Sequence, residues 1–334
     1  MPGNKAVQVL QPVPNNPLEG LAVSDTDIPS PGPGQVLIKL YLRTINPVEF
    51  FQAAGFFKPQ PPPFVIGIEG VGVVEALGPD TSGPFRPGQR VVGINYTQGT
   101  FQQYVVEDEK KLYAVPDEMS DDVAAQFYLN PFTALALVDT LDAPKGAWIL
   151  QTAAGSAVGR IVIQLAKHKG VKTINVVRRE AQAEELKQLG ADEVLVVNDE
   201  TPEGELASKV QDITGGEGAY GAAECVGDTL TGEVVNAVRP GGTTLVYGNL
   251  SHKPNLSIPT AAFFRGRKVD GCSVVRWLEA QGDKVTAHYD EMARLLIDGV
   301  VTPYTGKRFP LESVKEAMEE STKVARGGKV LLEG

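Results

Sequence analysis

The segment from Ile149 to Lys167 constrains the fold of this chain more than any other part of the sequence. It runs as Ile149-Leu-Gln-Thr-Ala-Ala-Gly-Ser-Ala-Val-Gly159 and continues in the helical pattern Arg160-Ile-Val-Ile-Gln-Leu-Ala-Lys167. An apolar strand therefore leads through a turn of small residues into a helix. Such a turn lets the backbone approach a pyrophosphate, whose charge is stabilised by the helix N-terminus. The segment predicts the first unit of a dinucleotide-binding sheet.

The turn matches the Gly-x-Gly-x-x-Gly pattern only in part. Its three key positions are Ala154, Ser156 and Gly159, so the last glycine alone is kept. The alternative is a generic strand-to-helix turn of an α/β fold. On the dinucleotide interpretation, the cofactor contacts fall on the turn residues Gly155, Ser156, Ala157, Val158 and Gly159.

Two arginines follow the next predicted strand. Arg178 and Arg179 come directly after Thr173-Ile-Asn-Val-Val177, about twenty residues beyond Gly159. NAD sites have an acidic residue at this place, which binds the ribose hydroxyls. Guanidinium groups instead bind a 2′-phosphate with charge-assisted hydrogen bonds. The pair therefore predicts NADPH as the cofactor, and the alternative is that both arginines are simply solvated.

Composition narrows the class of protein. The 334 residues carry a net charge of −10, with a pI near 5.0. This argues against general binding of nucleic acid or of anionic lipid. The sequence contains no apolar run near the roughly 20 residues of a membrane span and no signal-peptide pattern. Two cysteines fit a reducing compartment, so a cytoplasmic protein is expected.

The chain divides into regions with different patterns of predicted secondary structure. Residues 1–125 show short strand patterns with Gly and Pro turns, typical of a barrel-like unit. Residues 126–299 alternate strand and helix patterns, which predicts a doubly wound parallel sheet. The strand candidates are 147–152, 173–177, 193–197, 219–225, 243–248 and 267–272. The helix candidates are 157–169, 180–189, 204–214 and 229–238, with tail helices at 284–298 and 311–322 and a last strand at 327–332.

The sequence resembles the medium-chain dehydrogenase/reductase family over essentially its whole length. The matching landmarks occur in the family's order: Pro33-Gly-Gln-Val-Leu-Ile-Lys39, Asn46-Pro47, Gly67-Ile-Glu-Gly-Val-Gly-Val-Val74, Phe85-Arg-Pro-Gly-Gln-Arg-Val91, Leu189-Gly-Ala-Asp192 and Gly327-Gly-Lys-Val330. Within the family it is most similar to the mitochondrial-type 2-enoyl thioester reductases. Ser156 in the turn, the strand that ends at Arg178, and Asn130-Pro-Phe-Thr-Ala134 carry that similarity. Quinone reductases are the near alternative.

The resemblance implies an α/β protein with a GroES-like β-barrel domain and a Rossmann domain. The barrel domain would comprise residues 1–125 and 300–334, with the NADPH-binding domain, residues 126–299, inserted between them. The active site would lie in the cleft between the domains, and the protein would be a homodimer. The implied reaction is hydride transfer from NADPH to the β-carbon of a trans-2-enoyl thioester, with protonation of the α-carbon.

The zinc ligands of the alcohol dehydrogenases are missing. Isoleucine stands at position 68 in Gly67-Ile68-Glu69, where those relatives have a histidine ligand, and no cysteine lies near Asn46. The three histidines, His168, His252 and His288, fall outside the zinc positions. Zinc requires nitrogen or sulfur ligands at tetrahedral spacing, so no metal is expected.

The proton donor departs from the family pattern. Enoyl reductases use a tyrosine in the loop after Asn-Pro, and here the matching segment is Ala54-Gly-Phe-Phe57, with Phe57 at the tyrosine position. Tyr128 is a candidate replacement phenol, although it is equally readable as a packed aromatic. Asn46 is a candidate hydrogen-bond donor to a substrate oxygen, although a turn role before Pro47 is the simpler interpretation.

The family's positions predict the remaining site residues. Those assigned to the cofactor are Thr133, Cys225, Tyr247, Gly248, Val274 and Lys329, and those assigned to the substrate pocket are Phe56, Phe57 and Trp277. Cys225 is expected to be a small buried residue rather than a nucleophile, and Lys329 is alternatively a solvated lysine. Two functions remain as alternatives to the enoyl reductase: an NADPH-dependent quinone reductase, and an NADPH-binding protein without catalysis.

Overall fold

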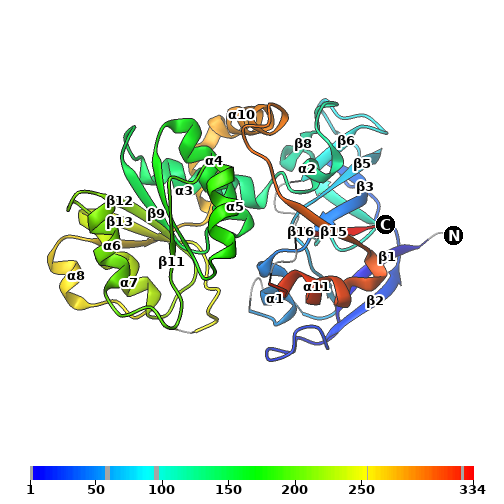
Figure 1. The fold of residues 1–334 in the computed structure, drawn as a ribbon. Coiled ribbons are helices and arrows are strands. Elements are labelled where there is room, and N and C mark those ends of the chain that lie inside the picture. Colours follow the sequence, from blue (N-terminus) through cyan, green and yellow to red (C-terminus); the bar gives the residue numbers. More distant parts are fainter. Residues whose placement is uncertain (1–2, 57–60, 94–97, 254, 325–326) are drawn as a thin grey trace. The chain divides into compact units, whose positions relative to one another are not determined.

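The computed structural model describes residues 3–56, 61–93, 98–253, 255–324 and 327–334. The chain forms two compact units (Figure 1). The first comprises residues 1–129, 289–297 and 302–334, and the second comprises residues 130–288 and 298–301. The first unit therefore contains segments from both ends of the sequence, and the second is built almost entirely from its middle.

The first unit is built on two sheets. One has the order β15-β16-β3-β5-β6-β8, with β7 also paired to β3, and the other has the order β2-β1-β4. The strands are β1 (Asn4–Val9), β2 (Leu21–Thr26), β3 (Gln35–Thr44), β4 (Phe64–Val65), β5 (Gly70–Leu77), β6 (Arg90–Gly93), β7 (Tyr104–Asp108), β8 (Leu112–Ala114), β15 (Thr305–Pro310) and β16 (Lys329–Glu333). The helices are α1 (Pro47–Ala53), α2 (Asp121–Ala125) and α11 (Val314–Thr322), with short 3₁₀ turns at Glu109–Lys111 and Leu311–Ser313.

The core of the first unit joins the two ends of the chain. Val7 and Phe101 pack with Leu311, Met318 and Val330 from the C-terminal segment. The terminal strand β16 pairs antiparallel with β3, which places Leu331 opposite Thr44. Because burial of these apolar side chains requires both segments, the C-terminal segment is part of this unit's fold.

The second unit is a doubly wound α/β domain, as the alternation of patterns predicts. Its six-stranded sheet has the order β11-β10-β9-β12-β13-β14, and all its strand pairs are parallel. The strands are β9 (Trp148–Gln151), β10 (Lys172–Val177), β11 (Glu193–Val196), β12 (Ala219–Glu224), β13 (Val238–Val246) and β14 (Lys268–Gly271). The order reverses between β9 and β12, and such sheets bind ligands at the carboxyl ends of the strands beside this switch point.

Helices cover both faces of this sheet. The helices of this unit are α3 (Leu129–Leu141, whose first residue belongs to the first unit), α4 (Ala157–Lys169), α5 (Ala181–Leu189), α6 (Glu205–Ile213), α7 (Leu230–Ala237), α8 (Thr260–Phe264), α9 (Val274–Gln281) and the start of α10 (Val285–Ile297), with a 3₁₀ turn at Gly282–Lys284. Val176 packs in one apolar cluster with residues of α6 and α7. Its neighbour Val177 packs in another with residues of α4 and α5. Because side chains alternate along a strand, the two clusters lie on opposite faces.

Apart from residues at the predicted boundaries (126–129 and 300–301), one segment falls into a different unit from the one that the sequence suggests. Residues 126–299 are the expected Rossmann domain, but Tyr289–Ile297 groups with the first unit. The Tyr289 ring lies 5.7 Å from that of Tyr113, and the Tyr113 hydroxyl donates to Asp290 at 2.9 Å. These contacts with the first unit are made by the second half of α10.

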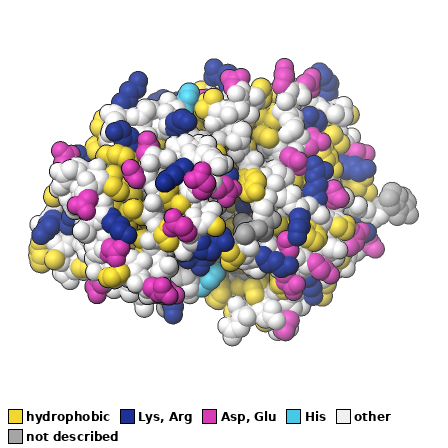
Figure 2. All heavy atoms as spheres, viewed as in Figure 1, with side chains coloured by type: hydrophobic (Ala, Val, Ile, Leu, Met, Phe, Trp, Pro, Cys, Tyr) yellow, Lys and Arg dark blue, Asp and Glu magenta, His cyan; other side chains and the backbone are white. Residues whose placement is uncertain are grey.

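The surface shows mixed charge. On the face in Figure 2, basic and acidic side chains are interspersed over both units. In the part of the chain that the structure describes, no helix is both long and apolar enough to cross a membrane.

Candidate active site

The turn before α4 has the local geometry of a phosphate-binding turn. Ser156 is the N-cap residue of α4, and its hydroxyl accepts from the backbone N–H of Gly159 at 3.1 Å. A Cβ at position 159 would lie 2.7 Å from the Cα of Ala154. Only glycine therefore allows the helix to pack this closely on the turn. The predicted contact residues 155–159 lie together at the start of α4, where unpaired N–H groups attract an anion.

A buried amide network supports this turn from below. The Gln151 side-chain NH₂ donates to the carbonyl of Gly159 at 3.0 Å and to Asn175 Oδ1 at 2.7 Å. The Asn175 NH₂ in turn donates to Thr173 Oγ1 and to the carbonyl of Glu193, both at 2.9 Å. Side chains of β9 and β10 therefore link these strands to the first turn of α4.

Arg178 and Arg179 follow the carboxyl end of β10. Both side chains are exposed, and neither forms an ion pair with a described residue. Their guanidinium groups are therefore available to a ligand at the carboxyl edge of the sheet.

The carboxyl end of β12 is organised by Glu224, a fully buried acid. Its carboxylate accepts from the backbone N–H of Val226 at 2.7 Å and from that of Gly227 at 3.1 Å. It also accepts from the hydroxyls of Thr152 at 3.2 Å and Thr231 at 3.1 Å. Because four donors face the carboxylate, it fixes the turn that follows β12.

Cys225 and Tyr247 lie beside that turn. The Cys225 N–H donates to Thr152 Oγ1 at 3.1 Å, and burial raises the pKa of its thiol to about 12. The Tyr247 hydroxyl is shielded from solvent. Burial is the main cause that holds the pKa of Tyr247 well above the usual value, and the neighbouring Cys225 thiol raises this pKa further. A Cβ at Gly248 would lie 3.1 Å from the Cβ of Cys225. With so high a pKa, Cys225 is a poor nucleophile at neutral pH.

Three further predicted residues of the second unit lie on helices. Thr133 is buried on α3, and Val274 is the buried first residue of α9. Trp277, also on α9, is half-buried, and its ring centroid lies 5.0 Å from that of His288. Trp277 therefore has a packing partner of its own within this unit.

Asn46 in the first unit belongs to a buried polar cluster. Its NH₂ donates to Glu69 Oε1 at 2.9 Å and to Thr44 Oγ1 at 3.0 Å, and its Oδ1 accepts from the Lys329 ammonium. Each N–H of an amide can make one good hydrogen bond. Donation to a substrate oxygen would therefore require Asn46 to give up one of these contacts.

The same cluster contains a second carboxyl group, Glu49, in the first turn of α1. Its Oε2 accepts from the backbone N–H of Asn46 at 2.6 Å, while Oε1 is buried with no partner among the described residues. The pKa of Glu49 is raised to about 8, mainly by burial and further by the nearby Glu69 carboxyl group. Hydrogen bonding from the Asn46 N–H and the charge of Lys329 oppose this increase in the pKa. Lys329 itself is buried rather than solvated.

The remaining candidates of the first unit differ in exposure. Tyr128 is 2% exposed, and Phe56 is 67% exposed. Phe57 falls outside the described residues. Ile68 is buried, and among the described side chains no group of three or more His, Cys, Asp or Glu residues lies together as metal ligands would.

Sequence reasoning missed three buried residues that organise these sites: Gln151, Glu224 and Glu49. Only Glu49 carried a readable signal. Asn46-Pro-Val-Glu49 is a capping-box pattern, in which the residue at the third helical position returns to the N-cap backbone. Gln151 and Glu224 stand in apolar strand patterns, and nothing local marks their partners.

Two family descriptions match the chain: an alcohol dehydrogenase GroES-like domain over residues 32–117 and a zinc-binding dehydrogenase over residues 157–294. The mitochondrial enoyl-[acyl-carrier-protein] reductase of Arabidopsis thaliana is 34% identical over 296 residues, which cover 86% of this chain and 76% of the relative. A provisionally named NADPH:quinone reductase from Bacillus thuringiensis has 27% identity and a TM-score of 0.90, covering 99% of both chains. A mycobacterial protein solved with NADPH has 26% identity and a TM-score of 0.88, covering 99% of this chain and 100% of its own. Together with the two folds, these matches show that the chain belongs to the medium-chain dehydrogenase/reductase family.

Proposed function

We propose that this protein is an NADPH-dependent reductase of an activated C=C bond, with a trans-2-enoyl thioester as its substrate. The assignment of NADPH as the cofactor rests on the exposed pair Arg178 and Arg179, which follow β10 on the same sheet edge as the Ser156 turn. The substrate class is supported by the 34% identity to a protein named enoyl-[acyl-carrier-protein] reductase.

Each part of the nucleotide site has a distinct role in this proposal. The N–H groups at the start of α4 bind the pyrophosphate, and the two arginines bind the 2′-phosphate. The turn fixed by Glu224 and the strand end at Tyr247 and Gly248 orient the nicotinamide half. When bound, NADPH supplies the hydride. Thr133, Val274 and Lys329 remain proposed cofactor contacts.

The reduction also requires a proton for the α-carbon and stabilisation of the developing enolate oxygen. We assign the proton to the Tyr128 phenol, because Phe57 has no hydroxyl to offer. Asn46 is assigned to the enolate oxygen through its amide, whose orientation is set by Glu69 and Lys329. Phe56, Phe57 and Trp277 are assigned to the substrate pocket.

A quinone reductase is the second candidate. It is supported by the 27% identity to the provisionally named NADPH:quinone reductase and by the phenylalanine at position 57. A quinone takes up its protons on oxygen, so its reduction does not depend on a donor placed at a carbon atom. A protein that binds NADPH without turning over either substrate would support the third alternative, loss of catalysis.

The cofactor assignment is tested by Arg178→Ala. Loss of a charge-assisted hydrogen bond, worth about 1.5–3 kcal/mol, should weaken NADPH binding about 10- to 100-fold and leave NADH binding unchanged. Isothermal titration with each nucleotide measures both. Arg86→Ala is the matched control, because Arg86 is an exposed cation of the first unit. An unchanged preference for NADPH in Arg178→Ala would refute the assignment.

The assembly and the compartment are also proposals. We propose a homodimer, and among the described strands β14 pairs on one side only, with β13, so its other edge is open for a second copy. Light scattering after gel filtration tests this.

Both cysteines are free thiols, which fits a reducing compartment. We propose the cytoplasm, and cell fractionation distinguishes it from the mitochondrial location that the relative's name carries.

A further inference from the structure

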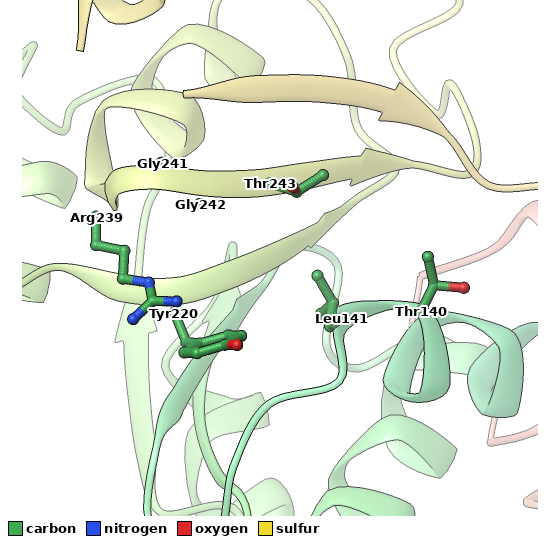
Figure 3. A pocket seen from close by; sticks show the side chains of 7 residues that line it. All are labelled: Thr140, Leu141, Tyr220, Arg239, Gly241, Gly242 and Thr243. Atoms are coloured by element: carbon green, nitrogen blue, oxygen red, sulfur yellow. The ribbon is translucent and has the colours of Figure 1, made fainter. Parts of the chain in front are cut away.

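A bulge in β13 opens a pocket at the amino-terminal edge of the second unit's sheet. Ala219 of β12 lies opposite Val238, but Gly221 lies opposite Thr243. Over this interval β12 advances by two residues and β13 by five, so β13 contains three more residues than β12 and the strand bends. The resulting pocket has a volume of about 150 Å³. It is lined by this bulge, by Tyr220 and by the end of α3 (Figure 3).

The charged group in this pocket is Arg239, which belongs to the bulge. Its guanidinium carbon lies 3.8 Å from the centre of the Tyr220 ring, and Figure 3 shows the two side chains together at one end of the pocket. Among the described residues, no side chain or carbonyl accepts a hydrogen bond from Arg239, and its buried Nε has no partner. Arg239 is half-buried. It is therefore held in place by a ring while its Nε lacks a hydrogen-bond partner, which is unfavourable for a buried polar atom.

The charge of the residues that line the pocket favours an anion. No acidic residue lines it; the other lining side chains with polar atoms are those of Tyr220, Thr140 and Thr243. Further cations lie on the neighbouring segment: the carbonyl of Arg265 accepts from Gly241 N–H at 3.3 Å, and Lys268 pairs in register with Thr243. The stack on Tyr220 limits the motion of the guanidinium, so less conformational entropy is lost when an oxyanion binds in its plane.

We propose that this pocket is a binding site for a small oxyanion, a carboxylate or a phosphate group, that pairs with Arg239. The site is separate from the proposed cofactor site. Tyr220 stands near the start of β12 and Cys225 follows its end, so the two are roughly 16 Å apart at about 3.3 Å per strand residue. Thr140 and Leu141 are the last residues of α3, whose carboxyl end carries partial negative charge, so we expect a weak Kd, on the order of 1 mM.

The test is isothermal titration of the full chain with sodium phosphate and with sodium acetate at low ionic strength. Each titration is made with and without saturating NADPH, because NADPH occupies the other anion site. We expect one equivalent of phosphate, acetate or both to bind in the presence of NADPH. Binding of both phosphate and acetate indicates that the pocket recognises the oxyanion itself. Binding of only one of them identifies the preferred chemical group, phosphate or carboxylate.

Two variants and a control complete the test. Arg239→Gln keeps the aliphatic stem but removes the charge, and it should weaken binding at least about 10-fold. Tyr220→Leu removes the ring that holds the guanidinium and should weaken binding without loss of the cation, so it serves where Arg239→Gln fails to fold. Lys187→Gln removes an exposed cation of α5 that does not line the pocket and should leave binding within about twofold. No saturable binding in the presence of NADPH, or equal binding by Arg239→Gln, would overturn the proposal.

Discussion

Replacing Glu49 with glutamine should make the stability of the first unit much less dependent on pH. Glu49 is fully buried beside Glu69, and burial raises its pKa from an ordinary 4.5 to about 8. Between these values the folded unit keeps a proton that the unfolded chain releases. The free energy of unfolding is therefore highest below pH 4.5 and falls as the pH rises through 8.

The size of the effect follows from the same pKa. Each pH unit across the interval removes about 1.4 kcal/mol, so the full loss is on the order of 5 kcal/mol. This is a large share of the 5–15 kcal/mol typical of a folded protein. A glutamine at position 49 still accepts from the Asn46 N–H through its carbonyl oxygen and carries no charge at any of these pH values.

The assay is urea unfolding between pH 5 and pH 9, followed by circular dichroism. Both tryptophans, Trp148 and Trp277, lie in the second unit, so their fluorescence reports that unit separately. Glu49→Gln should match the wild type near pH 5 and exceed it by several kcal/mol at pH 9, within about the total loss expected above. Glu316→Gln, at an exposed acid of α11, is the control. The reasoning fails if wild-type stability is flat over this range, or if Glu49→Gln keeps the wild-type slope.

Three further predictions concern the candidate site. Gly159→Ala brings a Cβ to 2.7 Å from the Cα of Ala154 and should cost about 1–3 kcal/mol of stability and weaken NADPH binding. Gly271→Ala is the control, because a Cβ there meets nothing within 4 Å, and it should change neither property. Equal behaviour of the two variants in thermal unfolding and in NADPH titration would contradict the packing argument. Tyr128→Phe should lower kcat about 100-fold or more with the KM for NADPH unchanged, and a kcat near that of the wild type would leave Tyr128 as a packed aromatic. Cys225, with its pKa raised to about 12, should react with iodoacetamide at pH 8 far more slowly in the native protein than in urea, as mass spectrometry of the labelled peptide measures; equal rates would mean that the thiol is accessible.

Much of the second unit could be predicted because its helices and strands carry local periodicity. The helix expected at 157–169 is found at Ala157–Lys169, and the strand expected at 173–177 is found at Lys172–Val177. Helix α3 was not predicted, because its side chains are apolar on nearly all sides and Pro131 lies near its start. A helix buried all round lacks the one-sided pattern on which such a prediction depends.

The site could be predicted less completely, because its support comes from residues distant in the sequence. The small residues at 155–159 and the arginines at 178 and 179 carry local signals for a nucleotide. The partnership of Asn46 with Lys329 joins positions 283 residues apart, and no spacing in the sequence reveals it. Arg239 is similar: its Arg-Pro-Gly-Gly segment indicates a bend, but only the fold places Tyr220 against the guanidinium.

The central claim is tested most directly by the rate of NADPH oxidation by the purified protein. The assay compares trans-2-hexenoyl-CoA with 1,4-naphthoquinone at equal concentration, and the loss of nicotinamide absorbance reports turnover. We predict faster turnover of the thioester, with the hydride recovered on its β-carbon when deuterated NADPH is used. Preference for the quinone would contradict the enoyl reductase assignment and would indicate that the phenylalanine at position 57 marks a change of substrate.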